Sequence, residues 1–272
     1  MNAQPANCAW SGRPVRLSPC EFTACWDALD LGDTPVVLTR CGPGNGFDAA
    51  RRRDAMAALA RRGLSDGLRP HPSLVEPLRL LADPDYSIDI RFGAGPTIGL
   101  GATEDTRGVT VTMATASADG PLRLAAGTSA PVAATLLNLL TAAGPVNPGV
   151  GRPVNIPADA LDTALADVQR VRGGRSTDLW AVADRLEAAG IPRIDAASMV
   201  RMCEGMLCRG QLGATAHFGG PRRRAPWVIG FHATPAGWFM QLRRDSMVTI
   251  CPTDTTRLLH HWHDLASGLV SV

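Results

Sequence analysis

The sequence predicts an α+β protein with a pseudo-twofold duplication, in which each half contains helices, a four-strand antiparallel meander and a closing helix. Three observations lead to this prediction. The 272 residues exceed one average domain of about 150 residues but fall short of two. Segments with helical spacing and segments with strand-like alternation occur in separate blocks, as in α+β folds. The same order of blocks occurs twice, which indicates one domain over 13–272 with halves at about 13–145 and 152–268.

The first half opens with a helix whose start is well marked. Ser18-Pro19-Cys20-Glu21 has the residue types of a capping box, with proline at the first helical position. Phe22, Cys25, Trp26 and Leu29 then follow at the spacing of one helical face. Two further helical segments end at Gly63 and before an Asp-Pro breaker. The predicted helices are 18–31, 48–62 and 72–82.

Four short strand-like segments follow these helices. Each is rich in β-branched or alternating residues, and turns containing Gly, Pro or Asp separate them. Short connections of this kind join neighbouring antiparallel strands. They predict a meander over 87–92, 97–102, 109–114 and 122–126. A closing helix at 131–143 places Val132, Leu136 and Leu140 on one face.

After a Gly- and Pro-rich connector at 144–153, the same order returns. The predicted helices are 157–171, 178–189 and 195–207. The predicted strands are 211–218, 227–234, 237–243 and 247–252, and a closing helix spans 253–267. Pro19-x-Glu21 opens the first half as Pro157-x-Asp159 opens the second. This correspondence supports the duplication.

Composition excludes several classes of protein. A hydrophobic share of 45% with 19% charged residues lies outside the range of disordered chains. No apolar run reaches the roughly 20 residues of a transmembrane helix, and Met1–Ser18 lacks the charged and apolar regions of a signal peptide. We therefore expect a cytoplasmic protein without a membrane partner.

Charge and cysteine content exclude further kinds of partner and of site. The net charge is +2, so nucleic acid is not an expected partner. All basic residues are arginines, and with abundant Ala, Gly and Pro this indicates a GC-rich, for instance actinobacterial, genome. Seven cysteines without C-x-x-C spacing are typical of free thiols rather than of a disulfide framework or a zinc site.

No motif predicts catalysis. His260 and His263 are spaced to bind a metal from one helix, but we interpret them as the solvated side of that helix. The sequence lacks a Gly-x-Ser-x-Gly elbow and a phosphate-binding glycine loop. We therefore predict that the protein is not an enzyme and that it binds neither a metal nor a cofactor. The alternative is a small-molecule enzyme or effector-binding protein with a site between the halves, using His217, His232 and Cys251.

Two segments are candidates for contacting a protein partner. Met199, Met202 and Met206 lie in an apolar sector of roughly 160°, wider than the stripe that one core contact requires. We expect one exposed edge on this helix, since methionines adapt to helical partners; an unusually buried helix is the alternative. The run Arg222, Arg223, Arg224 is placed in a hairpin loop, either as a solvated turn or as a site for carboxylates of a partner.

The pattern of residue types resembles the mycobacterial EspG family across nearly the whole chain. The blocks that carry the resemblance are Leu17–Gly32, Arg62-Gly63-Leu64, Arg222–Gly237 and Val248–Asp254. Of these, Arg222–Gly237 followed by Val248–Asp254 is the most specific.

This resemblance implies a cytosolic chaperone of type VII (ESX) secretion. It implies binding to the exposed apolar tip of the PPE subunit in PE/PPE heterodimers, through the central sheet, the loop between the first two meander strands and the C-terminal helical bundle. A homodimer of the free protein is compatible with the sequence. In this sequence the loop is short. Together with the flanking residues it comprises Phe92, Gly93, Ala94, Gly95, Pro96 and Thr97.

Overall fold

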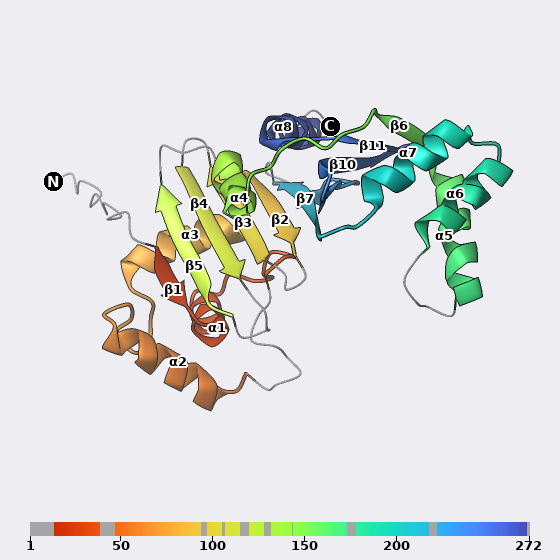
Figure 1. Ribbon diagram of the computed structural model, residues 1–272. Coiled ribbons are helices and arrows are strands. Elements are labelled where there is room, and N and C mark those ends of the chain that lie inside the picture. The colour runs from red at the N-terminus through yellow and green to blue at the C-terminus, as the bar shows by residue number, and fades with distance from the viewer. Residues whose placement is uncertain are drawn as a thin grey trace. The chain divides into compact units, whose positions relative to one another are not determined.

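The computed structural model describes residues 14–38, 47–93, 97–104, 107–114, 120–127, 132–142, 144–172, 178–217 and 222–270 (Figure 1). The chain packs as two compact units. Unit 1 takes its described residues from 1–91, 95–136 and 215–223, and unit 2 takes its own from 92–94, 137–214 and 224–272.

The first half of the chain forms one strand, three helices, four strands and a helix. These are β1 (Val15–Leu17), α1 (Pro19–Ala28), α2 (Ala49–Arg61), α3 (Pro72–Ala82), β2 (Tyr86–Phe92), β3 (Thr97–Glu104), β4 (Arg107–Ala114), β5 (Leu122–Gly127) and α4 (Val132–Thr141). The strand order is β1-β5-β4-β3-β2, with antiparallel pairing of β1 with β5, β5 with β4 and β4 with β3. β1 therefore pairs with the last strand of the meander.

Glu21 ties three segments of unit 1 together. Its backbone N–H donates to Ser18 Oγ at 3.2 Å, and its Oε2 accepts from the Ser18 backbone N–H at 2.8 Å, so the capping box forms. The same carboxylate accepts from the Arg62 guanidinium just after α2, at 3.1 and 3.2 Å. Arg62 also donates to the carbonyl oxygen of Arg16 in β1. A helix cap and an ion pair thus fix the positions of β1, α1 and α2.

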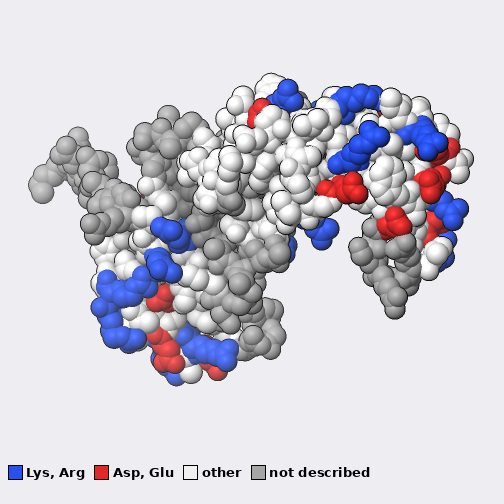
Figure 2. Space-filling model, in the orientation of Figure 1, with Lys and Arg blue, Asp and Glu red and all other residues white. Residues whose placement is uncertain are grey.

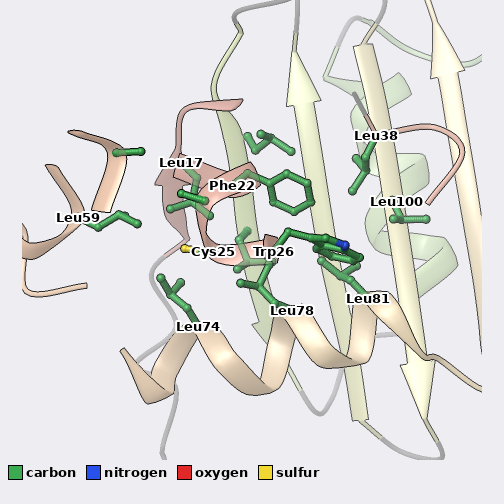
Figure 3. Packing of buried hydrophobic residues seen from close by; sticks show 14 of the residues in the cluster. Leu17, Phe22, Cys25, Trp26, Leu38, Leu59, Leu74, Leu78, Leu81 and Leu100 are labelled. Atoms are coloured by element: carbon green, nitrogen blue, oxygen red, sulfur yellow. The ribbon is translucent and has the colours of Figure 1, made fainter. Parts of the chain in front are cut away.

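The core of unit 1 lies between α1, α2 and α3 and one face of the sheet (Figure 3). Trp26 is fully buried, and its Nε1–H donates to the Gly32 carbonyl oxygen at 2.8 Å, so burial leaves no unpaired donor. Leu100 points into this core, whereas its neighbour Gly101 faces α4 on the other side of the sheet. A Cβ on Gly101 would lie 1.8 Å from Val132 Cγ1, so only glycine allows this approach.

The second half contains the same kinds of element in the same order, with one extra two-residue strand. These elements are β6 (Val154–Pro157), α5 (Ala158–Arg172), α6 (Leu179–Ala188), α7 (Arg193–Cys203), β7 (Cys208–Ala216), β8 (Arg223–Arg224), β9 (Ile229–Thr234), β10 (Gly237–Arg244), β11 (Met247–Pro252) and α8 (Thr255–Val270). The strand order is β7-β9-β10-β11-β6, and β8 pairs with β7. β6 again pairs antiparallel with the last meander strand.

Unit 2 also covers the two faces of its sheet differently. Phe239 and Ile250 form a core with buried residues of α5, α6 and α7. On α8, Trp262 is buried, and its Nε1–H donates to the Gly213 carbonyl oxygen of β7 at 3.0 Å. The unit therefore has a three-helix layer and a single helix packed against strands.

The structure confirms the α+β class and places the predicted helices and meander strands within a few residues of their expected limits. β1 and β6 were not predicted, because segments of three or four residues are too short to display an alternation pattern. The helix predicted at 195–207 is shorter at its C-terminal end: α7 ends at Cys203, and Gly205 adopts φ +66°. Arg223 and Arg224 form β8 instead of lying wholly in a loop. Among the described residues, no helix is long and apolar enough to cross a membrane.

Replacing Gly101 tests the packing of α4. In Gly101→Val, the new side chain collides with Val132, and we expect a loss of about 1–3 kcal/mol in the free energy of unfolding. Thermal and urea unfolding followed by circular dichroism measure this loss. Gly268→Ala in α8, where nothing lies within 4 Å of the new Cβ, is the matched control; it should gain up to about 1 kcal/mol. Equal stability of both variants would contradict the close approach.

Candidate functional site

Unit 2 presents a group of exposed apolar residues from three separate segments. We call it the turn patch; its members are Val150, Met206, Leu207, Pro235 and Ala236. The exposed fractions are 84% for Val150, 70% for Leu207 and 45% for Met206. Exposed large apolar side chains that cluster are a common mark of a protein-binding surface.

Backbone contacts bring the three segments of the turn patch together. The Val150 N–H donates to the Ala236 carbonyl oxygen at 3.2 Å, which joins the connector to the β9–β10 turn. The Leu207 N–H donates to the Ala233 carbonyl oxygen at 2.8 Å, which joins the α7–β7 turn to β9. These bonds hold the apolar side chains on one ordered framework.

Two glycines allow this framework to form. Gly237 has φ +117°, and a Cβ there would lie 2.6 Å from the Cα of Gly149. A Cβ on Gly149 would lie 2.1 Å from Cζ of Phe239. The connector can therefore rest directly on the Phe239 ring and on the β9–β10 turn only because both positions lack side chains.

A row of aromatic rings lies within unit 2. The ring centroids of Phe92 and Phe231 are 6.5 Å apart, and those of Phe231 and Trp238 are 6.0 Å apart. Phe92 is buried, so it supports this row rather than offering a free surface. Gly93, at φ +94°, donates its N–H to the Arg209 carbonyl oxygen at 3.0 Å.

The loop predicted to follow β2 is only partly described. Thr97, the first residue of β3, is half-buried. Ala94, Gly95 and Pro96 lie outside the described residues.

The expected exposed methionine edge of α7 is wrong for two of its three residues. Met199 and Met202 are only 3% and 1% exposed, because α7 packs against α6 as well as against β6, β9 and β11. The wide apolar sector thus serves two buried contacts. Met206 is exposed, but it lies in the turn beyond the helix end. Its neighbour Leu207 was missed, because helical spacing carries no information about residues in a turn.

The arginine run divides between two roles. Arg222 donates to the backbone carbonyl oxygen of Ala82 within unit 1. Arg223 and Arg224 are exposed on β8.

On the face that Figure 2 displays, the arginines of α2 are interspersed with acidic side chains, and Arg52 forms an ion pair with Asp27 at 3.1 Å. Charge by itself therefore distinguishes no separate site on α2.

The residues of the alternative small-molecule site are not brought together. His232 pairs with Phe239 and Cys251 pairs with Met240 in the strand register, so the two side chains point to opposite faces of the sheet. His217 forms an ion pair with Asp83 in unit 1. These placements argue against the predicted combination of the three residues.

Neither the Cys203 thiol nor the histidines of α8 are in surroundings that favour catalysis or metal binding. Burial raises the pKa of Cys203 to about 11, so its thiol stays protonated at neutral pH and is a poor nucleophile. His260 and His261 each lie 3.7 Å from Asp264. Within the described part of the chain, no three His, Cys, Asp or Glu side chains are grouped to hold a metal ion.

An α+β fold that presents an apolar patch on an ordered framework has the features of a protein-binding module. The model of the EspG family matches residues 18–263, and the chain belongs to this family. A solved structure of similar fold is the Mycobacterium tuberculosis type VII secretion system chaperone EspG5 in complex with the PE25–PPE41 dimer. The TM-score is 0.69 at 13% identity, over 91% of this chain and 93% of that chain. A comparison with curated proteins returns no match.

Glutamate substitutions at two methionines should distinguish a buried core position from an exposed surface position. Met202→Glu places a carboxylate in a dry core, and we expect a loss of about 3 kcal/mol or more in the free energy of unfolding. Met206→Glu keeps its new charge in water and should leave the melting temperature nearly unchanged. Differential scanning fluorimetry of both variants measures the contrast. A Met202→Glu protein as stable as the wild type would mean that this side chain is not buried in solution.

Proposed function

We propose that this protein is a cytosolic chaperone of type VII (ESX) secretion, which binds the PPE subunit of PE/PPE heterodimers and keeps the pair soluble until export. Membership of the EspG family and the bound PE25–PPE41 dimer in the EspG5 structure support the partner class. The observation in this chain that carries the proposal is the turn patch, where three segments expose Val150, Met206 and Leu207 together.

The chemistry of the patch fits an apolar client tip. Burying apolar surface contributes about 25 cal/mol per Å², and a few central side chains usually dominate such an interface. Leu207 offers a branched apolar anchor, and Met206 offers a flexible side chain that adapts to a partner. Because the framework is already hydrogen-bonded, little ordering entropy is lost on binding.

The other predicted contact residues take secondary roles in this proposal. Gly93, whose N–H donates to the Arg209 carbonyl oxygen of β7, would contribute a backbone-held contact, and Ala94, Gly95, Pro96 and Thr97 stay predicted contacts. Arg223 and Arg224 are exposed on β8, and guanidinium groups suit contacts with carboxylates of the client. Met199 and Met202 are buried in the core of unit 2, so in this proposal they hold α7 in place and do not touch the client.

We also infer that the two halves of the chain arose by duplication. Each half runs through one strand, three helices, four meander strands and a helix. In each half the first strand pairs with the last meander strand, β1 with β5 and β6 with β11. An experimental structure in which the halves do not superpose element by element would contradict this inference.

Co-expression with PE/PPE pairs encoded in the same genome tests the chaperone function. We expect one pair to co-elute with the tagged protein in size exclusion and to precipitate without it. Leu207→Glu and Met206→Glu should each weaken that complex about tenfold or more, because a charge in an apolar contact is costly to desolvate.

Leu68→Glu is the matched control for this experiment. Leu68 in unit 1 is 82% exposed and lies outside the turn patch, so its variant should bind as the wild type does. A folded wild-type protein that forms no complex with any pair would overturn the chaperone proposal. A stable complex that tolerates both patch variants would instead remove the turn patch from the contact.

A further inference from the structure

Two consecutive residues of β9 hold both ends of the α7–β7 turn. His232 Nε2 lies 2.8 Å from the carbonyl oxygen of Met202, just before the helix ends. Since a carbonyl oxygen only accepts, Nε2 carries the proton and donates it. The carbonyl oxygen of the next residue, Ala233, accepts from the Leu207 N–H at 2.8 Å. The turn that exposes Met206 and Leu207 is thus fastened at each end to the same strand.

The Met202 carbonyl is one of the last four of α7, which lack partners within the helix. Many helices satisfy such groups with a left-handed glycine that follows a helical C-cap residue. Here Gly205 has φ +66°, but the C-cap residue Glu204 before it is already extended, at φ −68° and ψ 136°. The imidazole N–H of His232 takes over part of that task. Its bond marks the point at which the chain leaves α7 for the turn.

The His232 ring is itself held in one orientation. It is buried and stacks on the Phe239 ring, with centroids 5.5 Å apart and an interplanar angle of 23°. The same Phe239 ring supports Gly149 of the connector, next to Val150. A ring clamped in this way donates along a fixed direction.

We propose that His232 is a positioning residue for client binding: its Nε2–H, through the Met202 carbonyl, holds the α7–β7 turn in the conformation that presents Met206 and Leu207 to an apolar segment of a PPE subunit. The inference rests on the proposed function. His232 does not touch the client in this arrangement, because its side chain is buried.

Two substitutions at this position separate the donor from the ring. His232→Phe keeps an aromatic ring for stacking and removes the donor, whereas His232→Gln keeps an N–H donor at a similar reach. If the turn adopts its presenting conformation only one tenth of the time without the donor, the apparent affinity falls about tenfold. We expect this loss in His232→Phe, and an affinity within about threefold of the wild type in His232→Gln.

The control is Trp262→Phe, which removes another buried N–H to carbonyl bond of unit 2, the one to Gly213. A merely structural role predicts that His232→Phe and Trp262→Phe lose affinity in proportion to their losses of melting temperature. A positioning role predicts that only His232→Phe loses affinity at temperatures where both proteins are folded. Affinity is measured by biolayer interferometry with the PE/PPE pair obtained by co-expression. If His232→Phe is insoluble, His232→Asn, whose amide is too short to reach Met202, replaces it.

Hydrogen exchange of the client-free protein gives a second readout. The Leu207 amide, which donates to the Ala233 carbonyl oxygen, should exchange at least about tenfold faster in His232→Phe than in the wild type, and at the wild-type rate in Trp262→Phe. Wild-type affinity in His232→Phe, or unchanged exchange in the turn, overturns the inference. If no PE/PPE pair binds the wild type, the proposed function fails and exchange by itself decides whether His232 positions the turn.

Discussion

Close packing around the Phe239 ring is the constraint on which the rest of the site depends. One side of the ring stacks on His232, and its edge meets Gly149 at a distance that no Cβ would allow. Gly237 removes a second side chain at the same crossing. Because these backbones pass so closely, the connector, the β9–β10 turn and the end of α7 form one framework. The exposed apolar side chains of the turn patch are therefore carried by well-packed backbone.

An exposed apolar surface is a hazard for any protein that also has free strand edges. The register places Ile156 and Val154 in hydrogen-bonded pairs with β11, since Ala158 bonds Ser246 further along the same ladder. The outward positions of this edge are therefore Pro153, Asn155 and Pro157, and the two prolines have no N–H to offer. In unit 1 the Arg62 guanidinium donates a hydrogen bond to the Arg16 carbonyl oxygen of edge strand β1, so this oxygen is already paired. Both features leave fewer backbone groups at these edges for pairing with a strand of another molecule.

The similarity to EspG5 at 13% identity illustrates what a fold retains. Sheet order and helix layers depend on which positions are apolar, and many residues satisfy that requirement. A client contact depends on the particular side chains that stand free of the core. In this chain the exposed apolar side chains of the turn patch come from turns and from the connector, and such segments vary most freely in a fold.

The sequence by itself determined the helices, the meanders and their repeated order, because caps, periodic apolar residues and glycine or proline breaks act over a few neighbouring residues. Ser18 and Glu21 form the expected capping box for this reason. Tertiary structure decided which apolar residues remain exposed: Met202 is buried because α6 and the sheet both pack on α7, while Leu207 is exposed because the helix stops four residues earlier than its pattern indicated. It also decided that His232 reaches Met202 across 30 positions of sequence, a contact set by strand register and ring stacking, which no local pattern records.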